Sequence, residues 1–153
     1  MTEKVLNLDQ QLCFSAYRVN RLFSQFYELA LTPFELTYPQ YLVLVALWEQ
    51  DHQAVHELGD HLHLASNTLT PLLKRLETAG WLTRIRPASN QRQLVISLTP
   101  KAISTQSEVA TAIAACIDSK DQDVHTDYER LLADNHHLIK TLQRIIDERK
   151  SQA

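Results

Sequence analysis

Residues 64–86, LASNTLTPLLKRLETAGWLTRIR, decide the fold because they hold a short helix, its stop signal and the start of a strand. The inner face of that helix consists of Leu69, Leu72, Leu73 and Leu76, which recur at helical spacing. Ser66 or its neighbour is expected to cap the first turn. Gly80 stands where a helix ends on a left-handed residue. Residues 81–86 then alternate between apolar and polar with a period of two, which predicts a strand.

The neighbouring residues extend this pattern into a winged helix. Residues 53–62 predict a short helix, and the brief turn at 64–66 joins the two helices into a helix-turn-helix. Residues 93–98 predict a second strand, and the turn cluster 87–91 joins both strands into a β-hairpin wing. Upstream, the apolar helix 41–48 is expected to be buried, and Thr37 with Gln40 predicts a capping box at its start. Residues 38–99 therefore form the predicted winged helix-turn-helix.

Long helices are expected on both sides of this region. Apolar residues recur at helical spacing from Leu8 to Ala30, which predicts a helix that ends before Pro33. Thr99 and Pro100 start another helix that runs to Ile117, and a polar break at residues 118–123 separates it from a last helix. The fold class is therefore mainly α with a small β-wing, in a single chain of 153 residues.

The flanking helices, within residues 8–32 and 100–150, have more apolar surface than a small core can cover. We expect them to pack against a second copy and form a two-fold homodimer. The alternative is that they fold back on their own domain.

The charge distribution indicates a phosphate-binding face. The net charge is −3, but residues 66–101 hold six basic residues and one acid, Glu77, which gives +5 there and leaves −8 elsewhere. A basic segment on an acidic protein is typical of contact with nucleic acid. There are two alternatives to contact with nucleic acid: a solvated charged surface, or a winged helix that binds another protein.

Within that segment, each element suits a different part of double-stranded DNA. Groove-facing hydroxyls and an amide come from Ser66, Asn67, Thr68 and Thr70. Lys74 and Arg75 suit phosphates or a guanine edge. The wing arginines, which suit the backbone or the minor groove, are Arg84, Arg86 and Arg92.

Composition argues against several other functions. The chain has only 2 glycines, which disfavours a Gly-rich phosphate loop, and no nucleophile–base pair or cofactor motif is visible, so we expect neither an enzyme nor a cofactor. The 7 histidines lack the spacing of a zinc site. Residues 1–10 do not have the pattern of a signal peptide, and no membrane span is visible, so we expect a cytoplasmic protein whose 2 cysteines are thiols at rest.

Several motifs together resemble a known family. They are the segments Gln11-Leu12-Cys13-Phe14, Leu36-Thr37-Tyr38-Pro39-Gln40-Tyr41-Leu42, Leu47-Trp48-Glu49 and 68–77 with Ala79-Gly80. Over residues 8–99 the chain is similar to the organic-hydroperoxide repressor branch of the MarR superfamily. Further along, the likeness is limited to the helix pattern and a cysteine, as in its two-cysteine subgroup.

The resemblance implies a homodimeric repressor that binds a pseudo-palindromic operator when reduced and releases it after oxidation by an organic hydroperoxide. Cys13 matches the peroxide-reacting cysteine. Tyr17, Tyr27 and Tyr38 match the tyrosines that surround it. Cys116 stands where the subgroup keeps a resolving thiol, which forms an intersubunit disulfide.

The residues support this assignment in part. A thiolate needs stabilising donors, and Cys13 is expected to lie past the first turn of its helix, where the helix dipole helps little. Tyr17 is one turn further on the same face, whereas Tyr27 is too far along the helix and has to come from the partner subunit. An apolar surround with Phe14 favours alkyl hydroperoxides.

Alternatives stay open at this point. Cys13 fits a small buried hydrophobe, Cys116 fits core filler, and the tyrosines fit ordinary core residues. A repressor released by a small aromatic ligand, without cysteine chemistry, has the same fold.

The chain also departs from the family's motifs at several positions. The family usually has tyrosine at His63, Asp-Ser-Gly at Ala65-Ser66-Asn67 and Asp-Glu-Arg at Asn90-Gln91-Arg92. We expect Ser66 to take over the N-cap and Arg92 to lack an acidic partner. These departures leave the operator sequence open.

Overall fold

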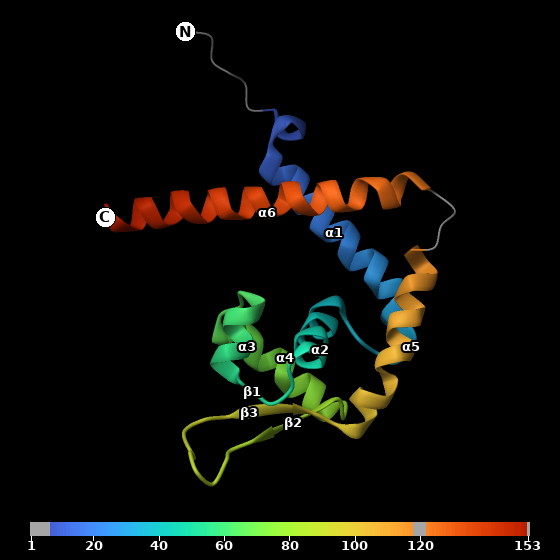
Figure 1. Cartoon of the computed structure of the whole chain (residues 1–153), viewed down its shortest axis with the longest axis vertical. Coiled ribbons are helices and arrows are strands. Elements are labelled where there is room, and N and C mark those ends of the chain that lie inside the picture. Colours follow the sequence, from blue (N-terminus) through green and yellow to red (C-terminus); the bar gives the residue numbers. More distant parts are fainter. Residues whose placement is uncertain (1–6, 118–121, 153) are drawn as a thin grey trace. The chain divides into compact units, whose positions relative to one another are not determined.

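The computed structural model describes residues 7–117 and 122–152, which belong to two compact units. The first unit ends at Ile117, and helix α6 (Gln122–Ser151) belongs to the second. In chain order the first unit contains η1 (Leu8–Gln10), α1 (Leu12–Leu31), η2 (Thr32–Phe34), α2 (Tyr38–Glu49), β1 (Gln53–Ala54), α3 (Val55–Leu62), α4 (Ser66–Thr78), β2 (Leu82–Ile85), β3 (Val95–Leu98) and α5 (Pro100–Ile117) (Figure 1). Most of the predicted polar break at 118–123 lies outside the described residues.

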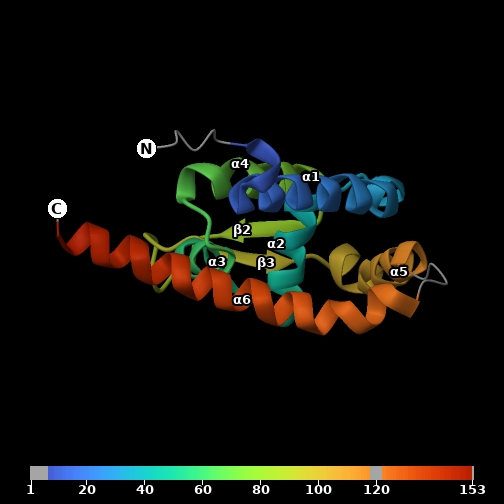
Figure 2. The same ribbon diagram turned by 90° about the horizontal axis from the view of Figure 1, so that it is seen from above.

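The three strands form one antiparallel sheet in the order β1-β3-β2. The hairpin predicted from period-two alternation is confirmed, with Leu82 opposite Leu98 and Ile85 opposite Val95. Figures 1 and 2 both show the loop that joins β2 and β3 at the opposite end of this unit from α5. The fold is therefore the expected winged helix-turn-helix, with the wing extending away from α5.

The first strand corrects the prediction of a helix over residues 53–62. Gln53 pairs with Ile96 of β3, and its side-chain Nε2 donates to the carbonyl oxygen of Ala46 at 2.9 Å. These contacts hold Gln53 and Ala54 in extended backbone. The helix begins only at Val55, and the amide of Ala54 donates to Glu57 Oε2 at 2.8 Å.

Three of the predicted helix boundaries are confirmed. Thr37 is the N-cap of α2, and its amide donates to Gln40 Oε1 at 2.9 Å. The hydroxyl of Thr99 accepts a hydrogen bond from the amide of Ala102 at 3.3 Å, so Thr99 caps α5. Gly80 follows the end of α4 with a φ of 77°, and the amides of Gly80 and Trp81 donate to carbonyls of the last turn, which is a Schellman motif.

Of the two candidates for the N-cap of α4, Ser66 and its neighbour, the structure selects the neighbour, and the expectation that the Ser66 side chain takes over the cap is wrong. Ala65 is the N-cap, and no side-chain hydrogen bond caps the helix. The carbonyl oxygen of Ala65 accepts hydrogen bonds from the amides of Thr68 and Leu69, both at 3.0 Å, so the helix starts directly after Ala65. Ser66 becomes the first helical residue and its side chain is exposed.

The core lies where the helix-turn-helix packs on the sheet. Leu69, Leu73 and Leu76 of α4 are buried, together with Trp81 and Ile96. The turn between α3 and α4 is tight, since a Cβ at Gly59 would lie 3.0 Å from the carbonyl oxygen of Leu64. This packing fixes α4 with its leucine face inward and its polar face outward.

The chain start also differs from the prediction of one helix from Leu8. The side chain of Asn7 accepts a hydrogen bond from the amide of Asp9 at 3.0 Å, which stabilises a short 3-10 turn over Leu8–Gln10. Gln11 is extended, and α1 begins at Leu12. Cys13 is therefore the second residue of α1, within its first turn. The expectation that Cys13 lies past the first turn is wrong for this reason.

Large apolar side chains remain exposed on helices of both units. On α1 they include Leu12, Leu22, Phe23 and Leu29, which is 76% exposed. On α6 they include Leu131, Leu132, Ile139, Leu142, Ile145 and Ile146. Within the part of the chain that the structure describes, no helix has the combination of length and apolar content that a membrane span requires.

Candidate DNA-binding surface and thiol site

The outward face of α4 carries the residues predicted to contact DNA. Their exposed side chains are those of Ser66, Asn67, Thr68, Thr70, Lys74 and Arg75. Neutral polar groups occupy the first two turns, and basic groups follow in the third. A helix with this face is suited to the major groove, because its N-terminal residues reach base edges while basic residues reach phosphates.

Two of the three wing arginines are exposed. The Nη1 of Arg86 donates to the carbonyl oxygen of Gln91 at 3.0 Å, which supports the loop of the wing. The amide of Arg92 donates to Asn90 Oδ1 at 3.2 Å, so Asn90 forms the turn that presents Arg92. Both side chains lie on the exposed end of the hairpin, as phosphate contacts require.

Arg84 has a different environment from the other two wing arginines. Its Nε donates to Glu77 Oε2 at 2.7 Å, and its Nη2 lies 2.6 Å from the same oxygen. Only 25% of the Arg84 side chain and 36% of the Glu77 side chain are exposed. Arg84 therefore joins β2 to the last turn of α4, and sequence reasoning missed Glu77 as its partner.

A second connection joins α5 to the end of α4. The hydroxyl of Thr99 donates to the carbonyl oxygen of Gly80 at 2.7 Å, and Lys101 Nζ donates to that of Ala79 at 2.9 Å. Lys101 Nζ also lies 4.5 Å from the ring centroid of Trp81. These contacts satisfy carbonyls that a helix end leaves without partners. We call residues 79–81 with Thr99 and Lys101 the α4–α5 corner.

Both cysteines are free thiols with exposed side chains. The alternative that either one fills the core of its own protomer is therefore wrong. Cys13 lies in the first turn of a helix of 20 residues, where free amides and the helix dipole favour negative charge. Cys116 lies in the last turn of α5, and α5 packs against α1.

Tyr17 follows Cys13 by four residues, which places both on one face of α1. Its hydroxyl oxygen accepts a hydrogen bond from Arg21 Nη1 at 3.2 Å, and Arg21 Cζ lies 5.8 Å from the Tyr17 ring centroid. Since the oxygen accepts from a cation, the tyrosine O–H becomes a stronger donor. Arg21 was missed in the sequence, although its i+8 spacing from Cys13 places it on that face.

Tyr27 and Tyr38 lie together, far from Cys13 along α1. Their rings stack with centroids 4.6 Å apart, and Tyr41, which sequence reasoning missed as part of this cluster, lies 5.3 Å from Tyr27. Tyr27 is fourteen residues beyond Cys13, a distance of about 21 Å along a helix. Within one protomer, Tyr17 therefore lies on the same face of α1 as Cys13, one turn away, whereas Tyr27 lies far from Cys13 along the helix.

Burial raises the pKa of Tyr38 and of Tyr41 above the ordinary value of 10.0. Both phenols therefore stay protonated at neutral pH and can donate hydrogen bonds. This is the property that a group opposite a thiolate requires.

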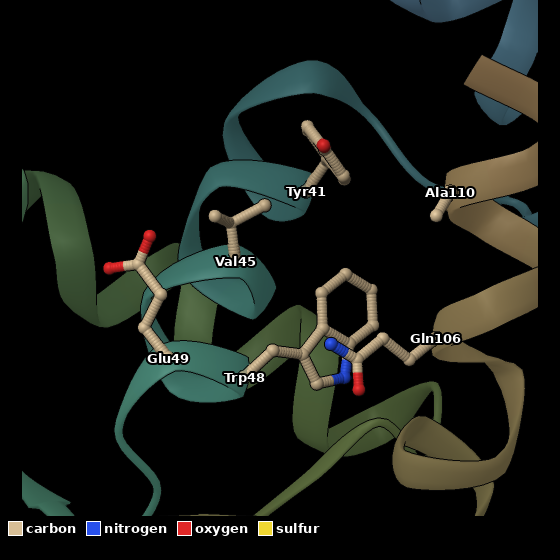
Figure 3. A pocket seen from close by; sticks show the side chains of 6 residues that line it. All are labelled: Tyr41, Val45, Trp48, Glu49, Gln106 and Ala110. Carbon is tan, nitrogen blue, oxygen red and sulfur yellow. The ribbon is translucent and has the colours of Figure 1, made fainter. Parts of the chain in front are cut away.

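A hollow of about 230 Å³ lies between α2 and α5 (Figure 3). Its lining residues are Tyr41, Val45, Trp48, Glu49, Gln106 and Ala110. Trp48 Nε1 donates to the carbonyl oxygen of Ala102 at 3.1 Å, which fixes the indole at the edge of the hollow. Figure 3 shows the Glu49 carboxylate directed away from Ala110.

Comparison with known proteins relates the whole arrangement to transcription. Residues 25–109 match the family described as Transcriptional regulator SarA/Rot. The organic hydroperoxide resistance transcriptional regulator of Bacillus subtilis (strain 168) is 36% identical over 91% of this chain and 94% of its own. The regulator TtmR of Methylorubrum extorquens (strain PA1) is 50% identical over 62% of this chain, which spans about half (49%) of the length of TtmR.

Solved structures of AbfR from Staphylococcus epidermidis resemble the chain as well. Reduced AbfR bound to DNA is 46% identical with a TM-score of 0.85, over 95% of this chain and 99% of its own. Overoxidised AbfR bound to DNA is 49% identical with a TM-score of 0.70, over 86% and 94%. Disulfide-formed AbfR is 48% identical with a TM-score of 0.64, over 92% of both chains.

Proposed function

The chain belongs to the MarR/SarA type of winged-helix transcriptional regulators, which are DNA-binding proteins and not enzymes, and from this premise we propose that it is a repressor released from its operator by organic hydroperoxides. The observation that carries the proposal is the place of Cys13: exposed, in the first turn of α1, with Tyr17 on the same face. We place the protein in the cytoplasm, where both thiols are reduced at rest.

The chemistry at Cys13 is a two-electron oxidation. The thiolate attacks one oxygen of the hydroperoxide, the O–O bond breaks, and sulfenic acid and an alcohol form after proton transfer. The thiol sulfur is oxidised and the peroxide is reduced. Tyr17, whose oxygen accepts from Arg21, is the donor that stabilises the thiolate from the same helix.

The second set of donors comes from the partner subunit of a homodimer. Tyr27 and Tyr38 are stacked at the far end of α1, and an antiparallel arrangement of two α1 helices brings them to the partner's thiol. The apolar side chains exposed on α1 and α6 support this assembly, because exposed surfaces of this size on a small protein mark an interface. Residues 8–32 and 100–150 therefore act in dimerisation.

Cys116 is the resolving thiol in this proposal. Its sulfur attacks the sulfenic sulfur of Cys13 in the other subunit, a disulfide forms, and water leaves. The existence of a disulfide form and of an overoxidised, DNA-bound form of AbfR supports a requirement for the disulfide in release. On this proposal, oxidation of Cys13 alone to a sulfinic acid does not release the protein from DNA.

DNA contact is assigned to residues 38–99 and centres on α4 and the wing. The groove residues are Ser66, Asn67, Thr68 and Thr70, and the phosphate residues are Lys74, Arg75, Arg86 and Arg92. Their exposure on α4 and on the wing supports this role on a pseudo-palindromic operator. Arg84 belongs to this surface as a brace rather than a contact, since Glu77 holds its guanidinium.

The experiment is a release assay with the full chain on a labelled operator duplex, titrated with cumene hydroperoxide and followed by non-reducing gels. Wild type is expected to release DNA and to run as a covalent dimer. Cys13→Ser should stay bound, and Cys116→Ser should lose the dimer band and remain bound. Release by Cys13→Ser at the wild-type peroxide concentration would refute the thiol mechanism.

The hollow between α2 and α5 supports a second candidate, a repressor released by a small aromatic ligand. Tyr41 and Trp48 supply aromatic walls, and a volume of about 230 Å³ suits a single ring. Release by such a ligand would persist after both thiols are blocked with N-ethylmaleimide, whereas peroxide release would not.

A further inference from the structure

The outward face at the start of α4 has an uncommon composition for a helix that contacts DNA. Residues 64–73 contain no charged side chain, and the first basic residue of the helix is Lys74. Ser66, Asn67, Thr68, Thr70 and Pro71 are all exposed. Arginine, the commonest reader of guanine, is therefore absent from the two turns that reach base edges.

Asn67 is the side chain on this face that can make two hydrogen bonds to one base. It is the second residue of α4, and its amide offers one acceptor and one donor group at a fixed spacing. This pair matches the N6 amino group and the N7 atom of adenine in the major groove. The hydroxyls of Ser66 and Thr68 bond to any base and so discriminate little.

The neighbours of Asn67 suit the base pair next to that adenine. Thr70 and Pro71 follow Asn67 by three and four residues, which places them on the same face of α4. Their methyl and ring carbons are apolar and exposed, as contact with a thymine methyl group requires. The Thr68 hydroxyl lies 3.5 Å from Asn67 Oδ1 and leaves that oxygen a second lone pair for the base.

We propose that Asn67 determines sequence specificity by reading an adenine in each operator half-site, with Thr70 and Pro71 against a thymine methyl group beside it. The proposal rests on the assignment of α4 to the major groove. Lys74 and Arg75, in the third turn, then supply phosphate contacts or read a guanine further along.

The test uses reduced full-length protein, without peroxide. High-affinity sites are selected from a randomised duplex library, and the adenine common to both half-sites is replaced by 7-deazaadenine, which lacks the N7 acceptor. Fluorescence anisotropy is expected to show about a tenfold weaker Kd for wild type, because a bidentate base contact is worth about 1–3 kcal/mol and 1.4 kcal/mol is tenfold.

The variants separate this reading from a general loss of binding. Asn67→Ala is expected to bind the two duplexes equally, and Asn67→Arg is expected to select guanine at that position. Asn135→Ala, which replaces an exposed asparagine of α6 outside the proposed DNA-binding surface, is the matched control and should keep the tenfold difference. Since Asn67 is exposed, its variants should keep the wild-type melting temperature.

Two results would overturn the inference. One is a selected site without a shared adenine. The other is an Asn67→Ala protein that keeps the full 7-deazaadenine penalty. Either result leaves peroxide-dependent release untouched, and loss of that release in the thiol assay leaves the adenine preference untouched, so the two proposals fail separately.

Discussion

Replacement of Arg84 by alanine tests whether this arginine braces the wing or contacts DNA. The sequence favours DNA contact, since Arg84 lies in a basic hairpin. The structure instead places its Nε and Nη2 at 2.7 and 2.6 Å from Glu77 Oε2. The prediction is that Arg84→Ala lowers stability and leaves the salt dependence of DNA binding unchanged.

The magnitude follows from the exposure of the pair. Exposed ion pairs contribute about 0.2–1 kcal/mol, and hydrogen bonds to charged groups contribute about 1.5–3 kcal/mol. Arg84 is 25% and Glu77 36% exposed, so screening by solvent is partial and about 1 kcal/mol is expected. For a chain of this length, that lowers the melting temperature by about 2–4 °C.

Two measurements decide the outcome. Thermal unfolding of Arg84→Ala, Glu77→Gln and the double variant should give a coupling of about 1 kcal/mol. The logarithm of Kd against the logarithm of salt concentration should keep the wild-type slope in Arg84→Ala. In Arg92→Ala the slope should fall by about 1.8, which is one phosphate for each copy in a dimer. A slope reduced by about 1.8 in Arg84→Ala, with unchanged stability, would refute the bracing role.

Three further predictions concern stability. Gly80→Ala should lower the free energy of unfolding by about 1 kcal/mol in chemical denaturation, because a φ of 77° is strained for a residue with a Cβ; an unchanged value would contradict the Schellman corner. Lys101→Met should lower the free energy of unfolding by about 1 kcal/mol, because the hydrogen bond from Lys101 to the carbonyl oxygen of Ala79 is lost. Lys140→Met, which replaces an exposed lysine of α6, is the control, and an equal loss there would show a general charge effect instead. Burial raises the pKa of Tyr41, so the protonated phenol stabilises the folded state. This contribution to the free energy of unfolding is complete below pH 10.0 and is lost as pH rises through the raised pKa. Tyr41→Phe should therefore lose less stability than wild type in an alkaline titration, and parallel curves would contradict this.

Features that depend on nearby residues could be predicted from the sequence. The leucine spacing of α4, the left-handed Gly80 and the alternation in the hairpin act within a few residues, and the structure confirms all three. The cap at Thr99 depends on the next three residues and is confirmed as well.

Features that depend on residues far away in the chain could not be predicted from the sequence. Gln53 and Ala54 form a strand because β3, more than forty residues later, supplies their partners. The pairing of Arg84 with Glu77 depends on the angle between α4 and β2, which no periodicity encodes. The helical spacing of apolar residues predicted that the first helix begins at Leu8. In the structure the side chain of Asn7 stabilises a separate 3-10 turn over Leu8–Gln10.

The candidate thiol site likewise has a part that the sequence predicts and a part that only the folded chain shows. The resemblance selected Cys13 and three tyrosines, and i+4 spacing placed Tyr17 beside Cys13. The place of Cys13 in the first turn of α1 and the contact of Arg21 with Tyr17 required the folded chain.

The α4–α5 corner gives the molecule a mechanical property. Because Thr99 and Lys101 fasten the first turn of α5 to the end of α4, the 18 residues of α5 form an arm about 27 Å long with its pivot beside the recognition helix. Sideways displacement of the far end of that arm by about 1 Å rotates the pivot by about 2°. In a dimer each copy has such an arm, and the two recognition helices must match half-sites about 34 Å apart. Rotation of the two pivots in opposite senses would change that spacing, so the proposed Cys116 disulfide, near the end of α5, would act on the DNA through the separation of the two recognition helices.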